Sequence, residues 1–306
     1  MKVAVTGASG FVGGAVTRAL RTAGHEVRPF GRRDASALQQ PLAGYEVWDV
    51  AAGTRTLDVD AVVHCAAEVG QWGAHSLFWR TNVQGTQHVT QSMPSAARLV
   101  YVSTASVYPP THSDSAIPES ASDGTRPVST YGRTKLAGER VASARDGSTI
   151  VLRPHIVYGV GDTTLWPRFD AARRNSSIRI PGDGTNRVSV THIGNLVSAV
   201  VAALESDAAA GVYNIADDEV PSLDELLRTM FARRGLPTQI QYVPRALAWS
   251  SAAAAECYWW LTSRRGEPPL TRYAVGSLAD PSVLDTSRAR AVLGYVPRWT
   301  YRDGPL

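Results

Sequence analysis

The segment TGASGFVGG, at residues 6–14, constrains the fold of this chain more than any other. It follows a short apolar run and opens a stretch, 11–24, whose apolar residues recur at helical spacing. Gly7, Gly10 and Gly13 stand three residues apart. A turn from strand to helix needs such glycines when it must pack closely and admit a pyrophosphate at the helix N-terminus. The segment therefore predicts a βα unit that binds a dinucleotide.

Strands and helices alternate through the rest of the first half. Short apolar runs predict strands, and longer runs with helical periodicity separate them. The predicted strands are 3–7, 26–30, 45–50, 61–67, 98–108 (running into a loop) and 148–159, and the predicted helices are 11–24, 78–93 and 126–144. This alternation predicts an α/β fold of the Rossmann type, in which helices cover both faces of a doubly wound parallel sheet.

The residues after the second predicted strand favour NADP(H) over NAD(H). An NAD site places Asp or Glu there for the ribose hydroxyls, but this chain has Gly31 followed by Arg32 and Arg33. Guanidinium groups suit a 2′-phosphate. Asp34, as a displaced acid, and a solvated arginine pair are the alternatives. Asp49, after the third strand, is placed to accept from the adenine amino group, unless it is an ordinary strand-end carboxylate.

The pattern loosens after about residue 160, where segments shorten and prolines become more frequent. We expect residues 1–160 to form an NADP(H)-binding Rossmann domain. Residues 161–306 should form a smaller, mostly helical substrate region, with some segments returning to the Rossmann core. Within it, a helix should begin near Ser222, and the apolar run 247–261 should form a surface or substrate-side helix.

Composition and charge narrow the classes of partner. The net charge is +4, but the basic residues are scattered without a run of five, which argues against nucleic-acid binding. Two cysteines indicate no disulfide framework and fit a reducing compartment, so we expect a cytoplasmic protein. A strand beginning at residue 2 is expected to leave no room for a signal peptide. The sequence contains no apolar run of 18 residues, so no transmembrane segment is predicted. No metal site is predicted.

One lysine stands apart from the other basic residues. Of 31 basic residues only Lys2 and Lys135 are lysines, and Lys135 follows Tyr131 by four residues in STYGRTK. The spacing puts both side chains on one face of the predicted helix. Lysine is a compact ammonium and arginine a wide planar fork, so a site that needs a point charge beside a phenol retains lysine. From this segment alone, chance is the alternative.

The motifs together resemble the extended short-chain dehydrogenase/reductase superfamily. They are TGASGFVG (6–13), HCAA (64–67), NVQGT (82–86), YVSTASVY (101–108), YGRTK (131–135) and LRPHIVYG (152–159). EVGQWG (68–73), RPHIVYGVGD (153–162), GDGTNRVSVTHIGN (182–195) and GEPPLTRY (266–273) are similar to the 3β-hydroxysteroid dehydrogenase/isomerase-like branch of the epimerase/dehydratase superfamily. Within that branch the chain most resembles bacterial 2-alkyl-3-oxoalkanoate reductases.

The resemblance implies catalytic roles for four residues. Tyr131 would donate its phenolic proton to a substrate carbonyl oxygen. Lys135 would lower the phenol pKa from its usual value of about 10 and would bind the nicotinamide ribose. Thr104 matches the family's catalytic Ser/Thr, with Ser103 as the alternative, and Asn82 would support the geometry of the site.

The resemblance also completes the expected contact set. The cofactor contacts are Gly7, Ser9, Gly10, Phe11, Val12, Gly13, Arg32, Arg33, Asp49, Val50, Cys65, Ala66, Ala67, Ser103, Tyr131, Lys135, Pro154 and Val157. The expected substrate contacts are Glu68, Trp72, Thr104, His155, Tyr158 and Trp166. We also expect four other aromatic residues near the pocket: Trp79, Tyr258, Trp259 and Trp260. For at least half of all the aromatic residues expected there, plain core packing is the alternative. Dimers are common in this superfamily, so a homodimer through the helices carrying NVQGT and YGRTK is also expected.

The expected activity is NADPH-dependent reduction of a ketone, or the reverse oxidation of an alcohol, on a hydrophobic or β-keto small molecule. A nucleotide-sugar epimerase or dehydratase is the first alternative. It predicts an Arg–Asp pair for a diphosphate, where this chain has Val188 and Ser189, with Arg187 one position away. A non-catalytic NADP-binding regulator is the second, although a regulator would not need the catalytic residues. Glu68 and Gln71 depart from the olefin-pathway pattern, so a tailoring reductase of another pathway fits equally well.

Overall fold

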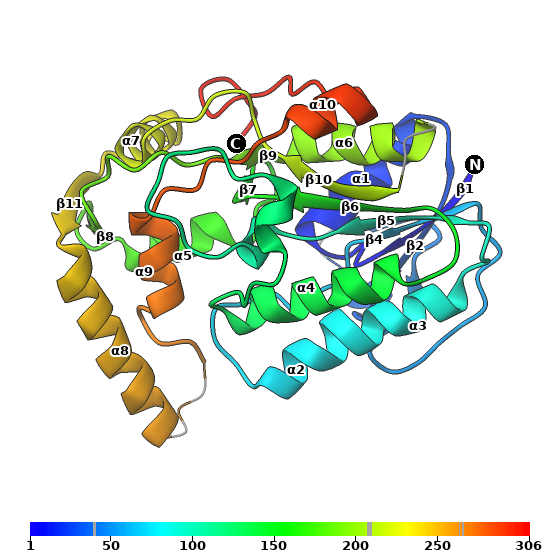
Figure 1. The fold of residues 1–306 in the computed structure, drawn as a ribbon, viewed down its shortest axis with the longest axis horizontal. Coiled ribbons are helices and arrows are strands. Elements are labelled where there is room, and N and C mark those ends of the chain that lie inside the picture. The colour runs from blue at the N-terminus through cyan, green and yellow to red at the C-terminus, as the bar shows by residue number, and fades with distance from the viewer. Residues whose placement is uncertain (39–40, 207–209, 263, 265) are drawn as a thin grey trace.

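A seven-stranded parallel sheet forms the centre of the molecule, with its strands in the order β10-β6-β5-β4-β1-β2-β3 (Figure 1). The computed structural model describes residues 1–38, 41–206, 210–262, 264 and 266–306. The strands are β1 (Lys2–Thr6), β2 (Glu26–Gly31), β3 (Glu46–Val47), β4 (Ala61–His64), β5 (Arg98–Val102), β6 (Thr149–Pro154) and β10 (Gly211–Ile215). The direction of strand progression reverses beside β1, which pairs with both β2 and β4. Ligands of such sheets bind at the carboxyl ends of the strands next to this reversal.

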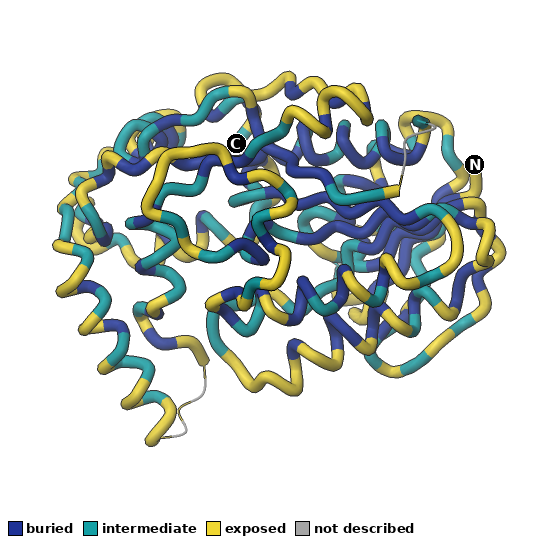
Figure 2. The backbone as a smooth tube through the Cα atoms, in the orientation of Figure 1, coloured by how far each residue is buried: buried dark blue, intermediate teal, exposed yellow. Residues whose placement is uncertain are grey.

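Helices cover both faces of the sheet, so the predicted Rossmann-type α/β fold is confirmed (Figure 1). One face carries α1 (Phe11–Thr22), α6 (Ile193–Glu205) and α10 (Ser287–Leu293), and the other carries α2 (His75–Trp79), α3 (Gly85–Ser92) and α4 (Thr130–Ser143). Along β1, Val3 and Val5 join the core beneath α1 and α6, while Ala4 joins the opposite core. Figure 2 shows the strands buried between these layers.

Several predicted elements differ in extent from the observed ones; among them, the strand predicted at 61–67 ends at His64 and the helix predicted at 126–144 begins at Thr130. The strand predicted at 45–50 is observed only as the short β3. Strand β2 ends at Gly31, so it offers β3 no further residues to pair with. The strand predicted at 148–159 breaks after Pro154, where Ile156 has a φ of +43°, and resumes as β7 (Val157–Tyr158), which pairs with β9 (Thr191–His192).

The helix predicted at 78–93 begins earlier, at His75, and contains a π turn at Arg80–Gln84 between α2 and α3. Such wide turns often occur at functional sites. Here the turn carries Asn82, and its three central residues are buried.

A second lobe is formed by α5, β8, α7, β11, α8 and α9 (Figure 1). Their bounds are α5 (Leu165–Ala172), β8 (Ser177–Pro181), α7 (Leu223–Arg233), β11 (Gln239–Val243), α8 (Arg245–Leu261) and α9 (Arg272–Ala279). The helix expected near Ser222 is α7, and the Ser222 hydroxyl accepts from the backbone N–H of Glu225. The chain returns to the Rossmann sheet through α6, β10 and α10, so segments of the two predicted regions interleave.

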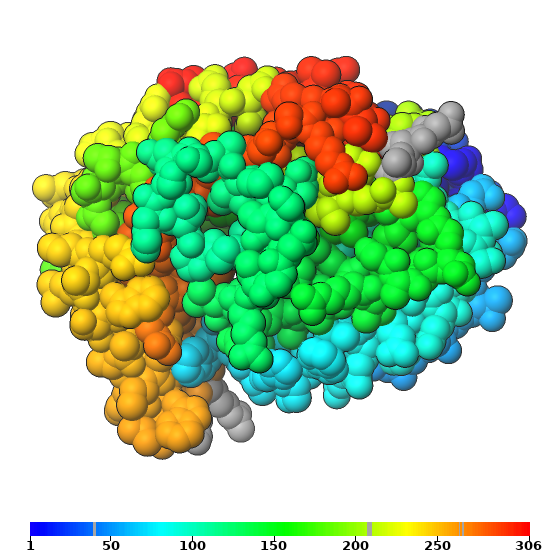
Figure 3. All heavy atoms as spheres, in the orientation of Figure 1, coloured from blue at the N-terminus to red at the C-terminus, as the bar shows by residue number. Residues whose placement is uncertain are grey.

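Helix α8 projects from the second lobe, as the surface helix expected at 247–261 (Figures 1 and 3). Ala248 and Ala252 are its buried residues, whereas the Trp260 side chain is 74% exposed. No helix in the described part of the chain is long and apolar enough to cross a membrane.

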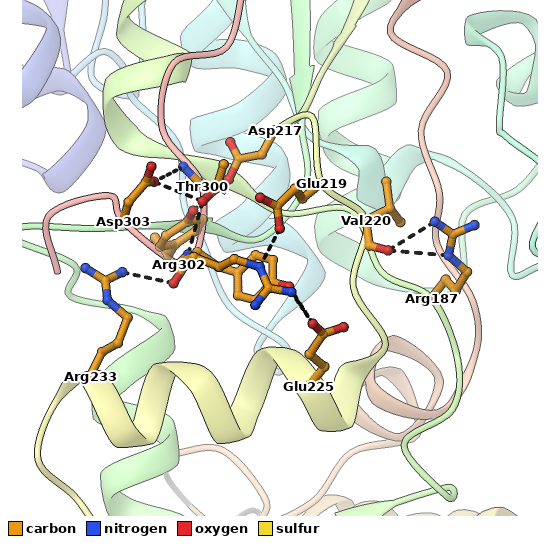
Figure 4. Close-up of polar contacts among 11 residues, drawn as sticks. Arg187, Asp217, Glu219, Val220, Glu225, Arg233, Thr300, Arg302 and Asp303 are labelled. Atoms are coloured by element: carbon orange, nitrogen blue, oxygen red, sulfur yellow. Dashed lines mark hydrogen bonds and ion pairs between the residues drawn. The ribbon is translucent and has the colours of Figure 1, made fainter.

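The C-terminal segment is tied to the junction between the two lobes around a buried carboxylate, Asp217 (Figure 4). The carboxylate accepts from the Tyr158 hydroxyl at 2.7 Å, from the His192 backbone N–H at 2.8 Å and from the Asn195 amide at 2.7 Å. The same Asn195 amide donates to the backbone carbonyl of Trp299 at 2.7 Å. Burial raises the pKa of Asp217 to about 6 from 3.8, which outweighs these hydrogen bonds.

The raised pKa makes stability depend on pH at this residue. The folded state binds the Asp217 proton more tightly than the unfolded chain, so this stabilisation is present below about pH 4 and lost as the pH rises through about 6. Asp217→Asn removes the titration while keeping the shape. Between pH 4 and 7, the free energy of unfolding of the parent chain should fall by about 3 kcal/mol relative to the variant. Urea denaturation at several pH values measures this difference. Asp58→Asn, whose side chain is 91% exposed, is the control, and parallel pH curves for parent and Asp217→Asn would contradict the argument.

Candidate active site

A cleft of about 430 Å³ runs along the carboxyl ends of the central strands. Its walls come from the glycine-rich turn after β1, the Arg32–Arg33 pair after β2, residues 65–69 after β4, residues 102–104 at the end of β5 and the first two turns of α4. Every residue that the sequence predicts as a cofactor contact lines this cleft. The structure therefore brings together residues that are up to 150 positions apart in the sequence, from Gly7 to Val157.

The glycine-rich turn fits a pyrophosphate. Gly7 has a φ of +68°, and a Cβ there would lie 2.7 Å from the backbone N of Ala66. A Cβ on Gly13 would collide with the carbonyl of Gly7, so both positions need glycine. Gly10 caps α1 with no side-chain hydrogen bond, and the first turn of α1 contains no acidic residue. The helix N-terminus thus keeps its amide donors and its positive dipole end for an anion.

The residues after β2 leave no acidic side chain in the place of an NAD-type ribose contact. A Cβ on Gly31 would lie 2.6 Å from the Tyr45 hydroxyl and 2.8 Å from the Ser9 hydroxyl, so a larger residue there would displace both. The Asp34 carboxylate turns to its own loop, where it accepts from Ser36 N–H at 3.0 Å and the Ser36 hydroxyl at 2.7 Å. Asp34 does not line the cleft.

Two guanidinium groups lie at this end of the cleft instead. Arg32 pairs with Glu68 at 3.3 Å, and its side chain is 61% exposed. The Arg33 guanidinium has no hydrogen-bonding or ion-pair partner among the described residues, and it lines the cleft. Asp49 also lines the cleft and accepts from Ala51 N–H at 2.9 Å. An anion such as a 2′-phosphate can bind at Arg33 without breaking an existing contact.

Tyr131 and Thr104 meet at the other end of the cleft. Ser129 caps α4 by accepting from Gly132 N–H at 2.9 Å, which sets Tyr131 in the first turn. A Cβ on Gly132 would collide with the Ser106 carbonyl, so α4 packs directly on the loop after β5. The Tyr131 hydroxyl lies close to the Thr104 side chain, which lowers the pKa of the phenol. Burial nevertheless raises the pKa of Tyr131 above its ordinary value of 10.

Lys135 is buried under the cleft rather than bonded to Tyr131. Its ammonium donates to the Val102 carbonyl at 2.7 Å and lies 4.0 Å from the centre of the Tyr101 ring. Burial lowers the pKa of Lys135 to about 7, and Glu139 opposes this shift. No hydrogen bond joins Lys135 to Tyr131 within the described residues. Loss of solvent around the phenol is the largest influence on its pKa in this structure, and an effect of the Lys135 charge on Tyr131 stays a prediction.

A buried ion pair, which the sequence analysis missed, supports this helix. Arg153 binds Glu139 through two hydrogen bonds of 3.0 and 2.6 Å, and both side chains are almost fully buried. The Ser103 hydroxyl donates to the same carboxylate, whereas the neighbouring Thr104 contacts Tyr131. This difference separates two hydroxyls that the sequence left equivalent. The spacing of Glu139, one helical turn after Lys135, is the signal that could have revealed it.

Asn82 lies behind the cleft and does not line it. Its amide oxygen accepts from Glu68 N–H at 2.8 Å, and its amide nitrogen donates to the Glu68 carbonyl at 3.1 Å and to the Thr134 hydroxyl at 3.0 Å. The hydrogen bonds of its side chain thus join the loop after β4 to α4, so Asn82 positions other groups. Cys65 lines the cleft, but burial raises the pKa of its thiol to about 12, which disfavours a nucleophilic thiolate.

A second cavity, of about 110 Å³, lies between the loop after β5 and the second lobe. His155 lines it, and its Nδ1–H donates to the Ser189 carbonyl at 2.6 Å. Burial lowers the pKa of His155, so its ring is neutral at pH 7. Trp249 is the tryptophan in the lining, although the sequence did not single it out as a contact. Ser106 and Tyr273, also not predicted, face each other here.

Several predicted substrate contacts lie elsewhere. Thr104 and Glu68 line the cleft, but Tyr158 and Trp166 are core residues. The Tyr158 hydroxyl donates to the Asp217 carboxylate, and Trp166 packs against two phenylalanines inside the second lobe. The other tryptophans and tyrosine expected near the pocket line neither cavity: Trp72, Trp79, Tyr258, Trp259 and Trp260. The last three belong to the projecting end of α8, which carries them away from the site.

Comparisons with known proteins agree with this geometry. The model of the NAD dependent epimerase/dehydratase family matches residues 3–216. The 2-alkyl-3-oxoalkanoate reductase of Stenotrophomonas maltophilia (strain K279a) is 35% identical over 320 residues, covering 99% of this chain and 97% of that protein. The 4-hydroxy-2-methyl-3-oxo-4-farnesyl-3,4-dihydroquinoline-1-oxide ketoreductase of Stigmatella aurantiaca is 28% identical over 315 residues, covering 99% of this chain and 94% of that protein. Among solved structures, MoeE5 in complex with UDP-glucose and NAD superposes with a TM-score of 0.75 at 27% identity, covering 99% of this chain and 96% of that chain.

The family match, the reductase relatives and the cleft at the strand reversal support a nicotinamide cofactor and an NAD(P)-dependent oxidoreductase. The chain belongs to the NAD dependent epimerase/dehydratase family, within the extended short-chain dehydrogenase/reductase superfamily.

Proposed function

We propose that the protein is an NADPH-dependent reductase of a ketone on a hydrophobic or β-keto substrate, able to run in reverse as an alcohol dehydrogenase. The observation that carries this proposal is the approach of the Tyr131 phenol to Thr104, where the cofactor cleft comes near the second cavity. The bound nicotinamide supplies the hydride. Burial keeps the Tyr131 phenol protonated, so it can donate to the carbonyl oxygen as negative charge develops there. The Thr104 hydroxyl, once turned from Ser106, would hold the same oxygen, and a protonated Lys135 four residues along α4 would stabilise the phenolate that remains.

The second cavity supports a substrate with apolar groups. Pro109, Ile117, Val128 and Trp249 contribute to its walls. The two reductase relatives are named for substrates that combine a 3-oxo group with alkyl or farnesyl chains. Both matches cover nearly the full length of the two proteins compared, which supports a related ketone as the substrate of this chain.

The epimerase alternative receives less support from the residues that would grip a diphosphate. Arg187 donates to the Val220 carbonyl at 3.4 and 3.1 Å, as Figure 4 shows, and lines neither cavity. Val188 and Ser189 are fully buried, and the Ser189 hydroxyl accepts from Leu284 N–H at 2.9 Å. The segment therefore offers no free cation to a nucleotide sugar. The regulator alternative is disfavoured because Thr104 and Tyr131 are assembled.

The experiment that tests the proposal follows nicotinamide absorbance while the purified protein reduces a panel of ketones, after any cofactor retained through purification has been identified. We expect exchangeable NADPH and turnover of ketones with β-oxo groups. A tightly retained NAD⁺ that does not exchange, together with turnover of a nucleotide sugar, would replace the reductase with the epimerase. If the protein binds NADPH tightly but reduces none of the ketones in the panel, the regulator alternative would be favoured.

Cofactor preference is predicted to depend on Arg33. Its guanidinium is free to bind a 2′-phosphate, and a hydrogen bond to a charged group contributes about 1.5–3 kcal/mol. Arg33→Ala should therefore weaken NADPH binding roughly 10- to 100-fold and leave NADH binding almost unchanged. Fluorescence titration with both nucleotides measures this. Arg179→Ala, at an exposed position on β8, is the matched control. Equal weakening of NADPH and NADH would show that Arg33 does not read the phosphate.

The proposed setting is the cytoplasm, because Cys65 and Cys257 are both free thiols, which suits a reducing compartment. A homodimer through α3 and α4 is proposed from the family resemblance. Sedimentation of the purified protein tests the oligomeric state directly.

A further inference from the structure

A row of hydroxyl groups leads from Tyr131 into the second cavity. Tyr131 lies beside Thr104, whose hydroxyl donates to Ser106 at 3.1 Å. The Ser106 hydroxyl lies 2.6 Å from the hydroxyl of Tyr273, which comes from α9 in the second lobe. Tyr131 and Thr104 line the cofactor cleft, whereas Ser106 and Tyr273 line the second cavity. The row therefore crosses from the cofactor side to the substrate side.

The position of Tyr273 is held from both lobes. Thr271 caps α9 by accepting from Ala274 N–H at 3.0 Å, and its hydroxyl donates to the Gln71 side chain at 3.0 Å. Gln71 belongs to the loop after β4, on the Rossmann side, and its backbone N–H donates to Glu267 at 3.1 Å. The second lobe thus presents Tyr273 to the Rossmann half at a defined place.

Ser106 and Tyr273 retain a donor for a ligand. Ser106 already accepts from Thr104, so in the arrangement in which it donates to Tyr273 the phenolic O–H stays free. The pair contacts no other polar side chain among the described residues. A hydrogen-bond acceptor that enters the cavity beside the reacting carbonyl can take this proton donor without displacing a structural contact.

The arginine side chains that line this cavity are already paired with carboxylates. Arg245 binds Asp280 at 2.7 Å, and Arg272 binds Glu256 at 2.7 Å. Asp280 itself lines the cavity beside Arg245, so this pair brings no free positive charge to an anion there. His155 donates through Nδ1 to the Ser189 carbonyl and presents no positive charge. The lining therefore suits a neutral acceptor oxygen better than a carboxylate.

We propose that Tyr273, held in place by Ser106, donates to a second, uncharged carbonyl oxygen of the substrate, placed β to the ketone that Tyr131 protonates. This inference rests on the proposed reductase function and narrows its substrate to β-keto esters, thioesters or amides. The single hydrogen bond of 3.1 Å between Thr104 and Ser106 separates the two binding points. That spacing suits oxygens on carbons one and three of a chain, and it is too short for a diphosphate between them.

The experiment compares three substrates of equal chain length with the holoenzyme: a β-keto ester, the free β-keto acid, and a ketone with a methylene in place of the ester carbonyl. The variants are Tyr273→Phe and Ser106→Ala, and NADPH affinity is measured for each. The parent should prefer the ester over both other substrates in kcat/KM. Tyr273→Phe should lower kcat/KM for the ester roughly tenfold and change it little for the plain ketone. Ser106→Ala should act in the same direction, with NADPH affinity unchanged.

Other outcomes separate the failure of this inference from failure of the proposed function. If Tyr273→Phe lowers kcat/KM equally for the ester and the plain ketone, the proposed contact with a second carbonyl is overturned. The phenol would then act only on the structure or on the reaction itself. No loss on either substrate would overturn it too, and preference for the free acid would overturn the neutral acceptor. In all three cases the protein still reduces ketones. If none of the three substrates is reduced with NADPH although the nucleotide binds, the reductase function itself fails.

Discussion

Tyr131→Phe is expected to lower kcat for ketone reduction roughly 10²- to 10⁴-fold, the range that a positioned general acid contributes. The substitution removes one hydroxyl and leaves the aromatic ring. In the proposed reaction this hydroxyl is the proton donor, and it lies beside Thr104 at the end of the cofactor cleft. The burial that raises the pKa of Tyr131 holds the proton until a carbonyl oxygen becomes basic enough to take it.

The measurement is steady-state reduction with a substrate from the active panel, together with NADPH titration by fluorescence. NADPH affinity should be nearly the same as in the parent chain, because the glycine-rich turn and Arg33 lie at other parts of the cleft. Tyr242→Phe is the matched control. Its hydroxyl donates to Asp224 at 2.6 Å in the second lobe, and it lines neither cavity. A fully active Tyr131→Phe protein would assign the acid to another residue.

Lys135→Arg is expected to reduce activity strongly although it keeps the charge. The Lys135 side chain is 1% exposed, and its ammonium sits between the Val102 carbonyl and the face of the Tyr101 ring. A guanidinium is planar and wider than an ammonium, and it cannot occupy this space without moving its neighbours. Overpacking a buried site costs about 1–3 kcal/mol, so thermal stability should fall as well. Displacement of α4 would also move Tyr131, four residues earlier.

The chain provides its own control for this substitution. Lys2, the other lysine, has a side chain 49% exposed and pairs with Asp58 at 3.4 Å, so Lys2→Arg should change neither activity nor stability. Lys135→Met separates charge from size, because it has a similar length without the ammonium. We expect Lys135→Met to fold and to lose activity. A Lys135→Arg protein with the activity and stability of the parent would mean that the rare lysine has no special role.

Local sequence patterns determined the class of fold and the position of the cleft. The glycines of residues 6–14 predict the βα turn because each acts on backbone within a few residues, as the collision between a Cβ on Gly13 and the Gly7 carbonyl illustrates. Alternating runs predict the layers because burial of a strand or helix face depends on residues of that element. The placement of Tyr131 and Lys135 on one helix is likewise a matter of spacing, and the structure retains it.

Contacts between distant segments were decided only by the tertiary structure. The partners of Lys135 lie 33 positions away, at Val102, and Ser106 meets Tyr273 across 167 positions. Two adjacent hydroxyls, Ser103 and Thr104, look equivalent in the sequence, but one contacts Glu139 and the other Tyr131. The aromatic residues of α8 could not be assigned from composition, since the direction of that helix carries them away from the site. Sequence periodicity indicates which face of an element is buried. The partner that this face meets depends on how the elements pack in three dimensions, and that packing forms the second cavity of this protein.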